Sequence, residues 1–153
     1  MLKNGMVIAL MDEYKKSTIE LKNILENLSQ TDFEQIRDTQ TKDEDCRSIQ
    51  TVISHVVQSG YTYANYVNQL FDMAWFEYDT QIDSPENCIS EINGMLDFSE
   101  QALNHLHTKT QKQIEAYSIK SRWGVTYTVE QLIEHAIVHI LRHRRQIEKF
   151  MLG

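Results

Sequence analysis

Three histidines recur at every fourth position near the end of the chain, in the segment EHAIVHILRHRRQ. They are His135, His139 and His143. On an α-helix this spacing keeps the side chains on one face, because four residues advance only about 40° beyond a full turn. Imidazoles at positions i and i+4 can bind one divalent metal ion together. The segment therefore predicts a helix face that can bind metal.

The apolar residues of the same helix separate the three histidines by their angle on a helical wheel. His143 lies roughly 35° from the centre of the apolar stripe, His139 roughly 75° and His135 roughly 115°. His139 and His143 are therefore expected at the core or its edge. An unsatisfied polar group buried there costs about 1–3 kcal/mol, so both need partners. His135 is expected outside the metal site.

A third ligand is expected from His55, in the segment TVISHVVQSGY, near the edge of the apolar stripe of an earlier helix. Three histidines that leave an open position for water are typical of a catalytic metal site, not a closed structural one. Two other metal sites are excluded by residue order. Glu134 precedes His135, so the segment is not the HExxH motif of zinc proteases. No glutamate lies three residues before His139 or His143, so the Glu-x-x-His pairs of a diiron bundle are absent as well.

The remaining cationic and aromatic residues are interpreted as structural. Two histidines near the end of the third predicted helix are expected to interact favourably with the helix dipole when protonated. The arginines around His143 are expected to be solvated or paired with acidic groups. No glycine-rich phosphate loop, nucleophile elbow or dinucleotide-binding motif occurs, and no general base can be assigned. The residues concerned are His105, His107, Arg142, Arg144, Arg145, Trp75 and Trp123.

Four helical segments with apolar residues at every third or fourth position are expected to carry these side chains. Ser84-Pro85 is a start signal for the third, and Thr128 with Gln131 forms a capping box at the start of the fourth. Gly60 is expected to bend the second. The predicted segments are 4–28, 45–75, 85–108 and 128–152.

These segments predict an all-α fold, a four-helix bundle with long first and third connections, in a single domain over residues 1–153. Long connections permit a crossover topology in place of simple up-and-down packing. The second connection is expected to be short. Residues 117–127, YSIKSRWGVTY, hold β-branched and aromatic residues and are interpreted as an extended lid over one end of the bundle.

Composition and charge indicate which classes of binding partner and which cellular compartment to expect. The 153 residues carry a formal net charge of −7, which disfavours nucleic acids and anionic membranes as partners. Cys46 and Cys88 form neither a CxxC pair nor a disulfide framework, so a reducing cytoplasm is expected. The N-terminal segment lacks the cleavage site of a signal peptide, and no apolar run is long enough to span a membrane.

One histidine in the second helix followed by H-x3-H-x3-H-R-x-Q-I in the last resembles the DinB/YfiT-like superfamily of bacterial proteins. The similarity spans nearly the whole chain as architecture. Its specific part is His55 and about thirteen residues of the last helix, with Trp123 in the preceding loop. The resemblance implies a divalent metal bound by His55, His139 and His143. Arg145 stands where the family's H-R-G-Q ending has glycine, a difference expected to affect surface or dimer contacts.

The resemblance also implies two activities. Some members of the superfamily are thiol-dependent transferases or isomerases that use a low-molecular-weight thiol such as bacillithiol or mycothiol, and others are described as metal-dependent hydrolases. The expected function is metal-dependent activation of a thiol or of water, acting on a small molecule. The alternative is a non-catalytic, homo-oligomeric metal-binding or interaction bundle. Zinc or nickel is the expected metal, with iron or copper as alternatives, and a homodimer is expected.

Overall fold

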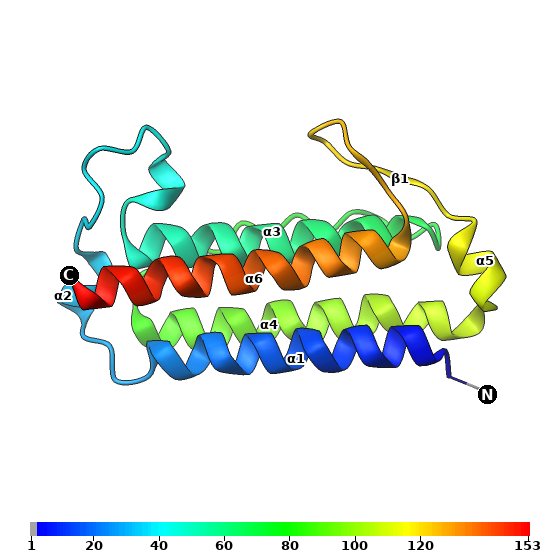
Figure 1. Ribbon diagram of the computed structural model, residues 1–153, viewed down its shortest axis with the longest axis horizontal. Coiled ribbons are helices and arrows are strands. Elements are labelled where there is room, and N and C mark those ends of the chain that lie inside the picture. Colours follow the sequence, from blue (N-terminus) through cyan, green and yellow to red (C-terminus); the bar gives the residue numbers. More distant parts are fainter. Residues whose placement is uncertain (1–2) are drawn as a thin grey trace.

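Four long helices build the molecule, and two short helices lie in the connections between them (Figure 1). The computed structural model describes residues 3–153, so the first two residues of the expected domain lie outside it. The all-α class is confirmed; the only strands within 3–153 form one two-residue pair. The long helices are α1 (Gly5–Leu25), α3 (Ile49–Gln69), α4 (Pro85–Asn104) and α6 (Val129–Leu152). The short helices are α2 (Gln30–Glu34) and α5 (Gln111–Glu115).

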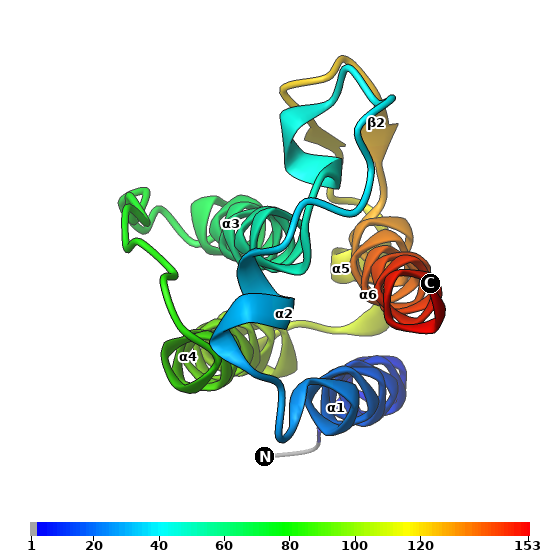
Figure 2. The same cartoon turned by 90° about the vertical axis from the view of Figure 1, so that its left-hand side faces the viewer.

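Each long helix packs against two others, in the order α1, α6, α3, α4 around a common core (Figure 2). The order of the helices around the core therefore differs from their order in the sequence. Figure 1 shows α1 and α6 running in one direction and α3 and α4 in the other. Because α1 lies diagonally opposite α3, the chain crosses from one to the other through residues 26–48, as the long first connection permitted.

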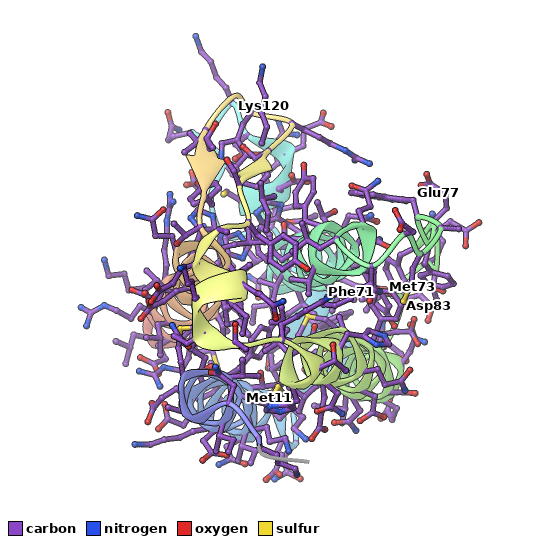
Figure 3. All side chains as sticks on the ribbon, turned by 90° about the vertical axis from the view of Figure 1, so that its right-hand side faces the viewer. Met11, Phe71, Met73, Glu77, Asp83 and Lys120 are labelled. Atoms are coloured by element: carbon purple, nitrogen blue, oxygen red, sulfur yellow. The ribbon has the colours of Figure 1, made fainter. Side chains whose placement is uncertain are left out.

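The second connection is longer than expected, because α3 ends at Gln69 and not near Trp75. Asp72 has a left-handed backbone conformation, with φ of 58°, which ends the helical path. The side chain of Asn65 then donates to the Phe76 carbonyl and accepts from the Phe76 N–H, both at 2.8 Å. After the turn at 70–72, this pairing holds the following irregular segment outside α3 and α4, where Figure 3 labels Met73, Glu77 and Asp83.

Gly60 does not interrupt α3, which is continuous from Ile49 to Gln69. Its role is close packing instead. A methyl group added at Gly60 would collide with the thioether of Met95, which is fully buried on α4. The absent side chain therefore allows α3 and α4 to approach, which is a tertiary reason for glycine in a helix interior.

The predicted helix starts are confirmed at α4 and α6. Ser84 accepts a hydrogen bond from the Asn87 N–H, with Pro85 in the first turn. Thr128 and Gln131 form a complete capping box at the start of α6. The third predicted segment ends at Asn104 as an α-helix and continues as the 3-10 turn η2 (His105–Thr108).

Two small elements stand on the same side of the molecule, above α3 and α6 (Figures 1 and 2). One is the 3-10 turn η1 (Glu44–Cys46), just before α3. The other is the antiparallel hairpin of β1 (Ile119–Lys120) and β2 (Thr126–Tyr127), which lies within the segment interpreted as a lid. They approach the same pair of helices from its two ends.

Candidate metal centre

Three histidine side chains converge between α3 and α6. The Nε2 atom of His139 lies 3.0 Å from Nε2 of His55 and 3.2 Å from Nε2 of His143. One nitrogen from each ring lies within 4.8 Å of those of the other two. The structure therefore brings together the three histidines that the sequence singled out, His55 from α3 and the other two from consecutive turns of α6.

The opposite nitrogens of two of these rings face acceptors. Nδ1 of His143 lies 2.8 Å from Oε1 of Gln146, and Nδ1 of His55 lies 3.4 Å from a carboxylate oxygen of Asp45. A carboxylate can only accept, and an amide oxygen likewise accepts. Nδ1 of His143 therefore carries the hydrogen, which leaves its Nε2 lone pair directed toward the centre of the cluster. The Asp45 carboxylate favours the same tautomer of His55.

With the hydrogens on Nδ1, the three Nε2 atoms have too few hydrogens for hydrogen bonds among themselves. A proton on Nε2 of His139 could be donated to one neighbouring ring but not to both. A divalent cation accepts all three lone pairs at once, and acceptors at Nδ1 are the usual outer partners of metal-binding histidines. The donor set therefore fits a divalent metal of the kind that binds imidazole, such as zinc, nickel, iron or copper.

Burial favours the neutral imidazoles that metal binding needs. It lowers the pKa of His139 to about 3, with smaller contributions from the positive charges of His143 and His55 when these are protonated. Burial also lowers the pKa of His143, and the contact with Gln146 opposes that shift. At neutral pH both rings are therefore uncharged, which is the form that binds a metal ion.

His135 lies outside the cluster, one turn before His139 on α6. Its ring contacts aromatic side chains: Tyr63 with centroids 5.4 Å apart, and Trp123 in a stacked arrangement at 5.8 Å. Tyr127 of β2 packs against it as well. His135 therefore forms part of an aromatic wall beside the cluster, in line with its angle on the helical wheel.

The other histidines and Arg144 have structural contacts. Nδ1 of His107 accepts the backbone N–H of Asn4 at 3.0 Å, which connects η2 to the start of α1. Arg144 pairs with Glu20 on α1 and with Glu148 on its own helix. Arg144 is therefore paired as expected. His107 has a structural contact, but as a hydrogen-bond acceptor and not as a protonated side chain at the helix dipole.

Sequence reasoning gave no role to two residues of this centre. Gln146 lies three residues after His143, a spacing that places the two side chains on one helix face and could have revealed the contact. Asp45 lies in η1, ten residues before His55, and no periodic signal connects them. Only the path of the first connection brings this carboxylate to the ring.

A cavity of about 370 Å³ opens beside His55 and His139. This volume is in the range of small-molecule sites. Side chains from α3, α6 and the hairpin line it, so the segment interpreted as a lid forms one of its walls. The lining residues are His55, Gln58, Ser59, Thr62, Tyr63, Arg122, Trp123, His135, His139 and Arg142.

Comparison with protein families matches residues 1–151 to the DinB family. The match covers both helices that carry the histidine cluster, and the chain belongs to the DinB family. A search of curated proteins found no match. Family membership agrees with the resemblance found in the sequence, and the cluster of three histidines could hold a metal ion. Among the helices of residues 3–153, none is both long enough and apolar enough to cross a membrane.

Proposed function

We propose that this single domain is a four-helix-bundle metalloprotein that binds one divalent ion through His55, His139 and His143. The observation that carries the proposal is the convergence of three Nε2 atoms. Two of the rings also present Nδ1 to an acceptor, Gln146 for His143 and Asp45 for His55. Zinc or nickel is the proposed metal, and iron or copper suits the same ligands. The mutual approach of the three Nε2 atoms supports metal binding as the role of these residues.

We further propose an enzymatic function, the activation of a thiol or of water in a thiol S-transferase-like or hydrolase-like reaction on a small molecule. A divalent ion held by three neutral ligands supplies Lewis-acid chemistry that makes water or a thiol nucleophilic near neutral pH. The chain's own residues orient this centre, with Gln146 fixing the ring of His143 and Asp45 that of His55. The adjoining cavity supports the proposal because it offers room for a substrate beside the cluster.

Metal content of single variants tests the site. His55→Ala, His139→Ala and His143→Ala should each lose most of the bound zinc, because two imidazoles hold the ion far more weakly than three. His135→Ala is the matched control, since it removes a histidine from the same helix but outside the cluster, and it should retain zinc. Elemental analysis after dialysis gives the result, with circular dichroism to show that each variant is folded. Equal zinc in wild type and His139→Ala would refute the site.

Turnover tests the enzymatic part separately. Zinc- and nickel-loaded protein should accelerate reaction of a low-molecular-weight thiol with an electrophile, or hydrolysis of a small ester or amide. Variants that lose the metal should lose this activity. No turnover across such panels at full metal occupancy would refute catalysis and leave metal binding intact.

A non-catalytic, homo-oligomeric metal-binding or interaction bundle is the second candidate. It is favoured by exposed apolar side chains on the segment outside α3 and α4, Met73 at 43% and Phe76 at 49% exposure. Light scattering should show a dimer at tens of micromolar if this surface pairs.

The free cysteines Cys46 and Cys88 support a reducing cytoplasm as the compartment.

A further inference from the structure

The cavity beside the histidine cluster differs in charge from the rest of the protein. The chain has 22 acidic residues and a net charge of −7, yet no aspartate or glutamate is among the residues that line this cavity. Two arginines, Arg122 and Arg142, do line it. Its fixed charge is therefore positive within an acidic protein, which favours an anionic occupant.

Arg142 is one of the two arginines that line this cavity, and its guanidinium has no carboxylate partner in the described part of the chain. Across residues 3–153, no carboxylate oxygen lies within 4.0 Å of its guanidinium, whereas Arg144, two residues later, pairs with Glu20 and Glu148. Arg122 is engaged differently, since its guanidinium lies 4.3 Å above the ring of Trp75. Arg142 has neither kind of contact within the described residues, so its guanidinium is available to a ligand in the cavity.

Arg142 also lies close to the cluster itself. It follows His139 by three residues on α6, so the two side chains share a helix face. Arg142 and His139 line the same cavity, together with His55. An anionic group that binds Arg142 would therefore place the rest of a small molecule beside the metal ligands.

Another part of the cavity wall is aromatic. Trp123 stacks on His135, and the ring of Tyr63 meets both edge-on, with centroids 6.2 Å from Trp123 and 5.4 Å from His135. Trp123 is still 45% exposed, so part of its ring is open to contact. Such a wall suits a flat apolar group.

We infer that the cavity is a substrate site for a small organic anion, whose carboxylate or similar group binds Arg142 and whose flat apolar part packs against Trp123. This inference rests on the proposed function, because it names the class of substrate presented to the metal centre. The Arg142 guanidinium donates two hydrogen bonds to such an anion, a geometry that a lysine could not reproduce.

Calorimetric titration with a matched pair of probes tests the anion site. Zinc-loaded wild type should bind phenylacetate more tightly than phenylacetamide, its uncharged counterpart. Arg142→Gln should lower the affinity for phenylacetate by about tenfold, the effect of losing a charge-assisted hydrogen bond, and leave that for phenylacetamide unchanged. Arg145→Gln removes the same charge from the same helix, at an exposed position outside the cavity, and should change neither.

Three outcomes would overturn the anion site: no preference for phenylacetate in wild type, unchanged affinity in Arg142→Gln, or an equal loss in Arg145→Gln, which would indicate general charge and not a site. Because a carboxylate can also bind zinc, the titrations are repeated on metal-free protein, where the effect of Arg142→Gln should persist. If wild type holds no zinc, the proposed metal function fails, whereas an arginine-dependent preference in metal-free protein still supports the anion site.

A second variant tests the aromatic wall. Trp123→Ala should bring the affinity for phenylacetate down toward that for acetate, which has the same charge but no ring. The affinity for acetate itself should not change, because Arg142 remains. Unchanged phenylacetate affinity in Trp123→Ala would overturn the aromatic part of the inference.

Discussion

At the scale of single residues, the orientation of each imidazole matters as much as its presence. His143 is buried, with 4% of its surface exposed, and Gln146 lies one turn along the same helix. The contact between them decides which ring nitrogen carries the hydrogen and therefore which one faces the cluster. The carboxylate of Asp45 faces Nδ1 of His55 at 3.4 Å from a more exposed position, so it favours the same tautomer through its charge.

Replacing Gln146 tests this positioning role. Gln146→Leu should weaken zinc affinity about 10- to 100-fold, the usual effect of losing an outer partner of a metal-binding histidine, while zinc still binds at saturating concentration. Gln146→Glu keeps an acceptor at the same distance and should retain the affinity. Competition with a chromogenic chelator measures both. Equal zinc affinity in Gln146→Leu and wild type would show that the contact does not orient the ring.

At the scale of the helices, the approach of α3 to α4 depends on Gly60. An alanine favours helix by about 1 kcal/mol over glycine, but at this position its methyl group must displace Met95 from a packed core. Overpacking of a core costs about 1–3 kcal/mol. The packing cost should therefore exceed the gain in helix propensity.

Gly60→Ala should accordingly lower the free energy of unfolding by about 1 kcal/mol. Gly5→Ala is the comparison, because a methyl group at Gly5, in the first turn of α1, meets no atom within 4 Å. Gly5→Ala should be neutral or slightly stabilising. Urea denaturation of the two variants decides the matter, and a Gly60→Ala protein as stable as Gly5→Ala would contradict the packing role.

At the scale of the whole molecule, the histidine cluster makes the stability of the metal-free protein depend on pH. The pKa of His139 is about 3 in the folded protein and near 6.5, the ordinary histidine value, when the chain is unfolded. Between these values the unfolded chain binds more protons than the folded one, so stability rises with pH. The stabilising effect of the neutral ring is complete above pH 6.5 and is lost as the pH falls toward 3.

Urea midpoints of the metal-free protein should therefore fall between pH 7 and pH 5. His139→Leu, which has no titrating group at this position, should show a smaller fall over the same range. Bound zinc should raise the midpoint at pH 7, because it binds the folded state alone. The same pH dependence in His139→Leu and wild type would assign the effect to other groups.

The sequence alone was sufficient where the signal is local and periodic. Apolar residues at every third or fourth position located the four long helices, the capping residues marked the starts of α4 and α6, and the helical wheel separated His143 and His139 from His135. These features depend on side chains within one or two turns of each other. The end of α3 was missed because apolar residues continue through Phe71 and Trp75, although Asn65 holds the backbone of Phe76 in an extended path.

Tertiary structure alone decided how those elements meet. Whether α3 and α4 run in the same direction depends on the path of residues 70–84, and no periodic pattern encodes a path. The contact of Asp45 with His55 depends in the same way on how the first connection folds back. Arg142 and Arg145 are equivalent as residues of a basic segment, and only packing places Arg142 on the cavity wall. A contact between distant segments is set by the free energy of the whole packed core, which no short stretch of sequence contains.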